Sequence, residues 1–133
     1  MLALLTRFIG LVQPTSSGTP VFDEKHYVPQ AWDMVESWFN PVLGGIESNP
    51  GYGLVVHPPL GKWLIGLGML AFGPDNGVGW RFSAAVAGTL SVLLVALATQ
   101  HLLRSVSLGA VAGLLLAVEG HHLVMSRIGL LDI

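Results

Sequence analysis

The sequence contains no cysteine and very little charge. Its six Lys and Arg and eight Asp and Glu make up 11% of 133 residues, against about 25% in an average soluble domain. The absence of thiols excludes disulfide scaffolds and thiolate metal sites. A formal net charge of −2 excludes the basic surface of a nucleic-acid-binding protein. Hydrophobic residues reach 52% and the mean hydropathy is +0.65, so we predict an all-α polytopic membrane protein.

Two apolar runs predict two membrane-spanning helices. Segment 81–103 carries no charge after Arg81, and at about 1.5 Å per residue it can cross a hydrocarbon core of about 30 Å. Segment 108–126 is also apolar, although one glutamate and two histidines interrupt its second half. The short turn 104–107 between them, which we expect on the cytoplasmic side, makes the pair an antiparallel hairpin.

The two ends of the sequence suggest continuation beyond both. Residues 1–13 are apolar apart from a few polar positions such as Arg7, but they are too few to span a bilayer. We expect them to be the end of a first transmembrane helix. Residues 127–133 then begin the next external loop. The chain is therefore expected to be the N-terminal fragment of one larger membrane domain.

Residues 14–80 differ in composition from the rest of the chain. They hold all eight prolines and six of the eight acidic residues, which predicts a long loop with amphipathic or interfacial helices. Val28, Val35 and Phe39 recur at helical spacing, and Pro29 is expected to be the first residue of that helix. The apolar segment 63–72 is too short to span and predicts a helix in or near the interface.

Asp23 and Glu24 form the first candidate site, in the sequence Val21-Phe22-Asp23-Glu24. Adjacent acidic residues are most often a solvated turn. Here the pair lies where a loop meets a membrane segment. Neighbouring side chains of an extended segment point in different directions. We therefore expect one carboxylate to face a substrate and the other to orient it.

Two further candidates are cationic. The sequence His57-Pro58-Pro59-Leu60-Gly61-Lys62 presents a histidine on a rigid backbone and places a lysine at the start of the next helix. It lacks the spacing and the Ser or Thr of a phosphate-binding P-loop, and a rigid elbow with an interfacial lysine explains it equally. Arg81 precedes the longer span. It suits either a membrane-interface anchor or a planar ligand of a phosphate group.

Glu119, His121 and His122 do not predict a metal site. Adjacent histidines on a helix lie about 100° apart, and the HExxH spacing of zinc enzymes is absent. Packing against a helix that is missing from this sequence, or a polar end at the membrane surface, explains them better. We expect no metal and no cofactor.

Several motifs in a fixed order resemble one family. They are Thr19-Pro20-Val21-Phe22-Asp23-Glu24-Lys25-His26-Tyr27, His57-Pro58-Pro59-Leu60-Gly61-Lys62, Gly79-Trp80-Arg81-Phe82-Ser83, Ser126-Arg127 and Leu130-Leu131-Asp132. Together they resemble the N-terminal part of a protein O-mannosyltransferase. The sequences FDEKHYVPQAW and NPGYGLVVHPPLGK are most similar to the actinobacterial branch that uses polyprenyl-phosphate mannose.

This resemblance implies an inverting enzyme of the GT-C glycosyltransferase architecture. Such an enzyme sits in the plasma membrane, with its catalytic loop outside the cytoplasm. It moves mannose from polyprenyl-phosphate mannose to Ser or Thr hydroxyls of proteins crossing the membrane. The expected partners are therefore this donor and acceptor proteins, including those at the translocon. By analogy Asp23 is the general base and Glu24 its neighbour in the family's Asp-Glu motif. The resemblance places His57, Lys62, Arg81 and Asp132 at motif positions that can contact substrate or the carrier phosphate.

Other functions stay open at this point. The later helices and the large external domain of a full-length member are missing from this sequence, and we expect it to be inactive alone. Another lipid-carrier glycosyltransferase of the same architecture would share much of this pattern. A small non-enzymatic membrane protein that binds a partner through its Gly- and Ala-rich helix faces would fit the length.

Overall fold

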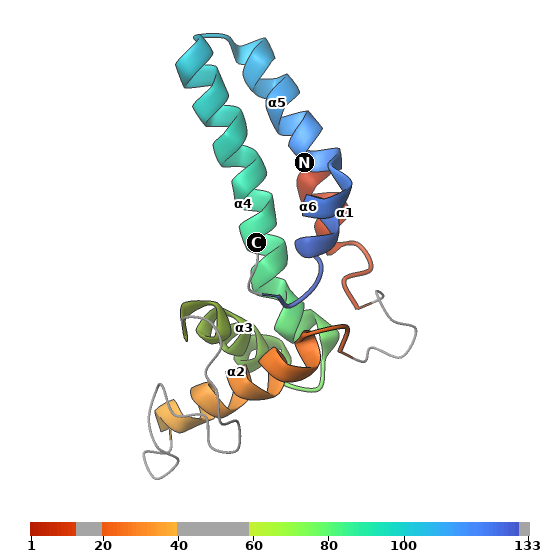
Figure 1. Cartoon of the computed structure of the whole chain (residues 1–133), viewed down its shortest axis with the longest axis vertical. Helices are drawn as coiled ribbons and strands as arrows, with labels where there is room; N and C mark the ends of the chain where they lie inside the picture. Colours follow the sequence, from red (N-terminus) through yellow and green to blue (C-terminus); the bar gives the residue numbers. More distant parts are fainter. Residues whose placement is uncertain (13–19, 40–58, 131–133) are drawn as a thin grey trace.

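The structure, a computed structural model, describes residues 1–12, 20–39 and 59–130. These residues form six helices, and no strand occurs among them. In chain order the helices are α1 (Leu2–Phe8), α2 (Glu24–Phe39), α3 (Pro59–Phe72), α4 (Gly77–Leu103), α5 (Val106–Val118) and α6 (Gly120–Met125). The expectation of a helical protein is confirmed. Figure 1 shows a long hairpin of α4 and α5 standing on the crossed pair α2 and α3.

Helix α4 is the longest element and, within the described residues, the one helix long and apolar enough to cross a membrane. Its first turn is capped by the Asn76 side chain, which accepts a hydrogen bond from the Val78 N–H at 3.0 Å. It ends at Arg104, whose φ of 49° is left-handed and stops the helix. The helix contains the whole uncharged run expected to span the membrane and begins four residues before the expected segment.

Helix α5 packs closely against α4 through small residues. A Cβ added to Gly109 would lie 2.6 Å from the Ala96 carbonyl oxygen, and one added to Gly113 would lie 2.8 Å from the Ala96 Cβ. Both positions therefore need glycine for the two backbones to approach, as in many membrane helix pairs. The expected antiparallel hairpin is present (Figure 1), with Arg104 and Ser105 alone between the two helices.

The second expected span is divided into two helices. Continuous helix was expected over 108–126, but α5 ends at Val118 and α6 begins at Gly120. Glu119 between them is extended, and its carboxylate accepts hydrogen bonds from the N–H groups of His121 and His122. The break has a local cause. A residue whose side chain caps a new helix has a non-helical backbone, so it cannot continue the preceding helix.

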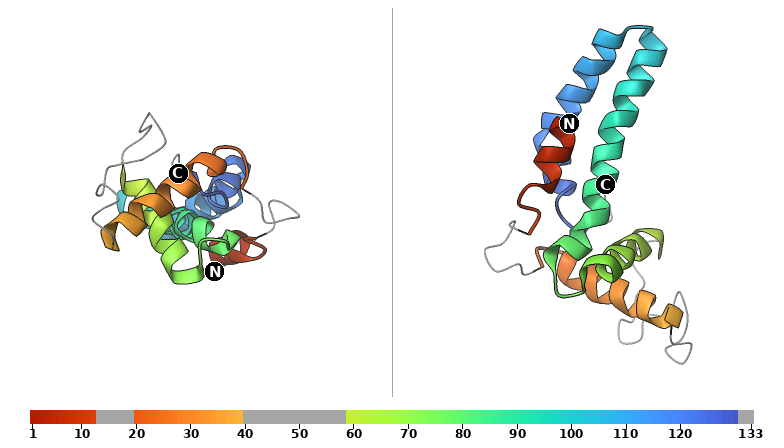
Figure 2. Two further views of the ribbon diagram at one scale, coloured as in Figure 1. Left: turned by 90° about the horizontal axis from the view of Figure 1, so that it is seen from below. Right: turned by 180° about the vertical axis from the view of Figure 1, so that it is seen from behind.

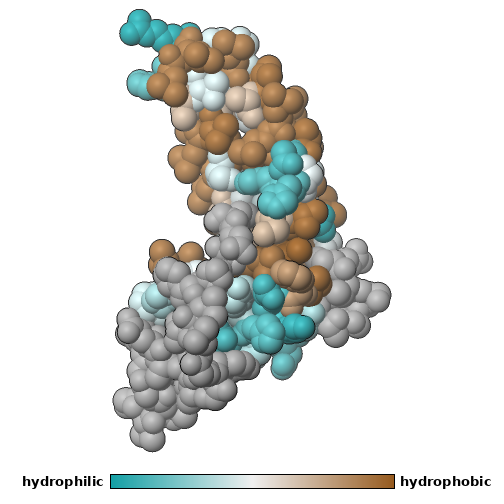
Figure 3. All heavy atoms as spheres, in the orientation of Figure 1, coloured by the Kyte–Doolittle hydropathy of each residue, from teal (hydrophilic) through white to brown (hydrophobic). Residues whose placement is uncertain are grey.

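The outer surface of the hairpin is apolar. Figure 3 shows hydrophobic residues over most of α4 and α5, with hydrophilic residues at the tip and further down. Large hydrophobic side chains are exposed along both helices, which suits contact with lipid: Leu90, Leu93, Leu94, Leu97, Leu102, Leu103, Leu108, Val111, Leu114, Leu115 and Val118. Helix α1 lies along the lower half of the hairpin (Figures 1 and 2).

Helices α2 and α3 cross below the hairpin (Figure 2). Helix α2 starts at Glu24, so the expectation that Pro29 would open it was wrong, and Pro29 lies inside the helix. The start is set upstream because the Asp23 carbonyl already accepts hydrogen bonds from the N–H groups of His26 and Tyr27. The core between these helices and the base of α4 contains Tyr27, Val28, Ala31, Ile65, Met69, Trp80 and Leu130.

Candidate functional site

The centre of the candidate site is a buried ion pair between α2 and α4. The Arg81 Nε donates to Glu24 Oε1 at 2.8 Å, and Arg81 Nη2 donates to Glu24 Oε2 at 2.7 Å. Neither side chain has any exposed surface. Two parallel hydrogen bonds between a guanidinium and a carboxylate form the strongest and most directional type of ion pair.

The same carboxylate also accepts two backbone hydrogen bonds. The Val21 N–H donates to Oε2 at 2.7 Å, and the Gly129 N–H donates to Oε1 at 2.6 Å. Glu24 thus joins three chain segments that are far apart in sequence. Position 129 must be glycine for this approach, because a Cβ there would lie 2.9 Å from the Trp80 carbonyl oxygen.

The third guanidinium nitrogen of Arg81 is also hydrogen-bonded. Its Nη1 donates to the carbonyl oxygens of Leu11 at 3.2 Å and Val12 at 3.4 Å, just after α1. The guanidinium therefore fastens the end of α1 and the start of α2 to the base of α4. Its predicted contact with a carrier phosphate stays a prediction, and this geometry favours a bracing role.

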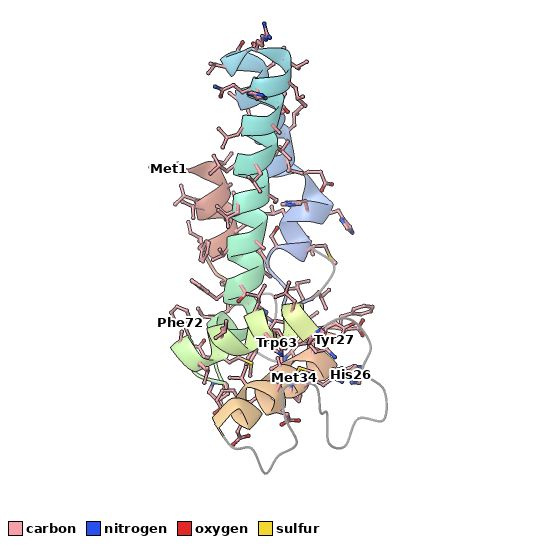
Figure 4. All side chains as sticks on the ribbon, turned by 90° about the vertical axis from the view of Figure 1, so that its left-hand side faces the viewer. Met1, His26, Tyr27, Met34, Trp63 and Phe72 are labelled. Atoms are coloured by element: carbon pink, nitrogen blue, oxygen red, sulfur yellow. The ribbon has the colours of Figure 1, made fainter. Side chains whose placement is uncertain are left out.

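Asp23 has different surroundings from its neighbour. It is half-buried and lines a cavity of about 340 Å³ together with His26, Tyr27 and Gln30. Since these positions are three, four and seven residues on from Asp23, they lie on one helical face. His26 and Tyr27 both project from the start of α2 in Figure 4. One carboxylate of the pair borders a cavity while the other is enclosed. The segment is a turn that enters α2, not the extended segment assumed in the sequence analysis.

The backbone just before Asp23 is strained. Phe22 has a φ of 53°, a left-handed conformation that costs an L-residue about 1–2 kcal/mol, and its ring is exposed. Backbone strain persists only where surrounding contacts impose it, and it clusters at functional sites. Here the hydrogen bond from Val21 to Glu24 holds the residue before Phe22, and α2 holds the residues after it.

Lys62 is the third described candidate and lies on α3. Its side chain is fully buried, and its Nζ has no hydrogen-bond partner among residues 1–12, 20–39 and 59–130. Burial lowers the pKa of the Lys62 ammonium below its usual value of 10.5, because desolvation disfavours the charged form. An anion bound next to this ammonium would offset the cost of burying its charge. His57 and Asp132, the remaining two candidates, lie outside the described residues.

A second polar cluster, which the sequence analysis missed, joins α1, α4 and α6. The Arg7 Nη2 lies 2.7 Å from His122 Nδ1, and Ser91 Oγ lies 2.9 Å from His122 Nε2. Arg7 is fully buried. His122 thus packs against α1 and α4 of this chain, whereas the sequence analysis expected a helix missing from this sequence or the membrane surface. No group of three or more potential metal-ligating side chains occurs in the part of the chain that the structure describes. Arg7, a charge within an apolar helix, was the available signal.

Arg127 ties the segment after α6 to the end of α1. It lies just after α6 and donates to the carbonyl oxygens of Thr6, Ile9 and Gly10 at 3.2, 2.9 and 2.9 Å. These are carbonyls at the end of α1 that the helix itself leaves unpaired or exposed. The segment after α6 therefore closes on both α1 and Glu24.

Comparison with known proteins identifies the family. The sequence model of the dolichyl-phosphate-mannose-protein mannosyltransferase family matches residues 1–133. The chain belongs to this family. Relatives of this mannosyltransferase-family chain include proteins called polyprenol-phosphate-mannose–protein mannosyltransferase in three actinobacteria. The protein of Corynebacterium glutamicum is 57% identical over 131 residues, which cover 98% of this chain and 25% of the relative.

Two mycobacterial relatives also match nearly the whole of this chain. The protein of Mycolicibacterium smegmatis is 52% identical and that of Mycobacterium tuberculosis is 49% identical, each over 99% of this chain and 24% of the relative. This mannosyltransferase-family chain therefore spans about a quarter of the length of the curated relatives it matches. No solved structure matches it.

The two carboxylates of the mannosyltransferase family's Asp-Glu motif have different surroundings in this structure. The Asp-Glu motif supplies one carboxylate that lines a cavity and one that is fully hydrogen-bonded. The former can accept a proton from a bound hydroxyl, whereas the latter has no free lone pair to offer a ligand beyond its four hydrogen bonds.

Proposed function

We propose that the protein containing this chain transfers mannose from polyprenyl-phosphate mannose to Ser or Thr hydroxyls of proteins, with inversion at the sugar carbon. The observation that carries this proposal is the similarity to protein mannosyltransferases along 98–99% of the chain. The cavity at Asp23 supports it, because the site offers a carboxylate beside open space. The chain would supply part of the catalytic site of a longer membrane enzyme.

Asp23 acts in this proposal as the general base. A hydroxyl is a poor nucleophile, and removing its proton as the new bond forms accelerates such a step by about 10²–10⁴-fold. The acceptor oxygen bonds to the sugar carbon, the bond from that carbon to the carrier phosphate breaks, and the proton passes to Asp23. The phosphate leaves as an anion and needs no acid, unlike the leaving alkoxide of a glycosidase.

The other candidate residues have separate roles in this proposal. Lys62 is the described group best suited to the carrier phosphate, because its buried ammonium has no protein counter-charge among the described residues. His57 and Asp132 stay candidates for contact with substrate or carrier from their sequence positions. Arg81 acts through Glu24, since its guanidinium is bound to that carboxylate and to the carbonyls after α1.

The same proposal includes an architecture and a location. A multi-pass GT-C membrane domain in the plasma membrane would place α4 across the bilayer and α2 and α3 at its outer surface, outside the cytoplasm. The apolar face of the hairpin supports the lipid contact. Acceptor proteins would then meet Asp23 as they leave the membrane, including at the translocon.

A chimera tests this function directly. This chain replaces the matched quarter of the Corynebacterium glutamicum relative, and membranes containing the chimera are assayed with polyprenyl-phosphate mannose and a Ser/Thr-rich peptide. We expect mannosyl transfer by the chimera and its loss in Asp23→Asn. Asp33→Asn, on the same helix but not among the residues that line the cavity, is the matched control and should keep transfer.

Two results would contradict the proposal. A folded, membrane-inserted chimera that transfers no mannose would show that this chain does not serve the reaction. Transfer that survives Asp23→Asn would remove Asp23 from the role of base while leaving the transfer activity in place. The chain alone, assayed in parallel, is expected to be inactive.

A further inference from the structure

Gln30 occupies an unusual position in the cavity that Asp23 lines. Its side chain borders that cavity, yet only 6% of the residue is exposed. Its Oε1 is enclosed and has no hydrogen-bond partner among the residues that the structure describes. A buried amide oxygen without a partner costs about 1–3 kcal/mol. Apolar side chains of similar size would avoid that cost, so stability does not explain a glutamine here.

A ligand in the cavity would remove the cost. The last torsion of a glutamine is broad and roughly two-fold, so the terminal amide can turn and present its oxygen and nitrogen to the open side. There it can accept a hydrogen bond through Oε1 and donate through Nε2. A backbone peptide group carries the complementary N–H and C=O.

The position relative to Asp23 indicates which substrate this is. In an inverting displacement the acceptor oxygen lies between the base and the sugar carbon that it attacks. Groups that share a wall with the base therefore contact the acceptor rather than the leaving side of the donor. Gln30 lies seven residues after Asp23 and borders the same cavity, so a segment that brings a hydroxyl to Asp23 can pass within reach of its amide.

We propose that Gln30 is an acceptor-positioning residue, whose amide hydrogen-bonds the peptide backbone of the segment that carries the reacting Ser or Thr. This inference rests on the proposed mannosyl transfer. It assigns a short docking edge to the start of α2 and the turn before it, with Asp23 at one end and Gln30 at the other. Recognition of the backbone rather than of a side chain would let the site accept many different sequences.

The test measures both Michaelis constants in the chimera that contains this chain. Gln30→Met keeps the length and approximate volume but replaces the amide by a thioether, which cannot donate and accepts only weakly. Gln30→Asn keeps the amide but withdraws it by one methylene. We expect both to raise the KM for the acceptor peptide by about three- to tenfold, with the KM for polyprenyl-phosphate mannose unchanged. The thermal midpoint of Gln30→Met should be equal to or above that of the parent, because a buried unpaired amide is removed.

Gln100→Met is the matched control, since Gln100 is exposed near the far end of α4. It should leave both constants unchanged. Unchanged acceptor KM in both Gln30 variants, or a rise confined to the donor KM, would overturn the inference. A parent chimera without any transfer would instead overturn the proposed function on which it rests.

Discussion

Glu24 and Arg81 lie 57 positions apart and meet through two hydrogen bonds of 2.8 and 2.7 Å with no solvent contact. The acidic member belongs to the loop-to-helix junction that carries Asp23, and the basic member lies near the base of the longest helix. The pair therefore couples the place of the predicted base to the membrane hairpin. Because both side chains are bound to each other and to backbone groups, we propose for the pair a positioning role rather than contact with substrate.

Removal of one partner of this pair should destabilise the fold strongly. Glu24→Gln leaves the Arg81 guanidinium buried without its counter-charge, and breaking a buried pair in this way costs about 3–5 kcal/mol. The measurement is the free energy of unfolding in detergent micelles. Glu36→Gln, an exposed position on the same helix, is the control and should change stability little. Equal stability of the two variants would refute the bracing role of Glu24.

Gly88 should tolerate no side chain. A Cβ there would lie 2.1 Å from Ser126 Oγ and 3.1 Å from Arg7 Nε, so Gly88→Ala would push α4 away from α1 and the end of α6. Overpacking of this kind costs about 1–3 kcal/mol, seen as a lower thermal midpoint. Gly120→Ala, with nothing within 4 Å of the added atom, is the control. Adding Ser126→Gly to Gly88→Ala should restore the midpoint, and a double variant as unstable as the single one would contradict this account.

Lys62→Met should raise stability and lower mannosyl transfer. It removes a buried ammonium without a described partner, and relief of an unpaired buried polar group is worth about 1–3 kcal/mol. The folded pKa of Lys62 lies below its usual 10.5, so between those two values the unfolded state binds more protons. The stability of the parent should therefore rise with pH toward 10.5. This rise should be smaller in Lys62→Met.

Unfolding free energies at several pH values, together with the transfer assay, check that expectation. Lys25→Met is the control because Lys25 is exposed at the start of α2. A Lys62→Met variant that is less stable than the parent would show that the ammonium has a partner. Full transfer by that variant would exclude Lys62 from the carrier phosphate.

Arg127→Met should loosen the end of α1. The guanidinium donates to three carbonyl oxygens there, those of Thr6, Ile9 and Gly10, and their loss exposes the backbone at 9–12. Amide hydrogen exchange should become faster in that segment while α5 is unaffected. Arg104→Met, at the exposed end of α4, keeps the same change of charge as a control. Unchanged exchange at 9–12 would contradict the anchoring role.

The helical composition, the long span and the hairpin could be predicted because each depends on local pattern. Segment 82–103 is uncharged and mostly apolar, and its partner follows after a short polar turn. The start of α2 and the break at Glu119 could not be predicted in the same way. The first depends on a backbone carbonyl that accepts the first helical hydrogen bonds, and the second depends on a carboxylate that caps a new helix. Periodicity reveals neither.

Sequence motifs supplied the residues of the candidate site, but their arrangement could not be predicted. Alternation along an extended segment indicated that Asp23 and Glu24 would face different surroundings. The partner of Glu24 could not be inferred, because Arg81 serves equally as an interface anchor, a phosphate ligand or half of an ion pair. Gln30 carried no signal at all, since an amide on an amphipathic helix is ordinarily a solvated side chain.

The four hydrogen bonds of Glu24 have a consequence for biosynthesis. One of them comes from the Gly129 backbone, a residue made more than a hundred positions after Asp23 and beyond both arms of the hairpin. On a nascent chain the loop around Asp23 therefore lacks one of its clamps until the second arm has been inserted and the segment after α6 has returned. The hydrogen bonds of Glu24 are therefore completed late, and a partly inserted chain would hold the neighbouring Asp23 less firmly.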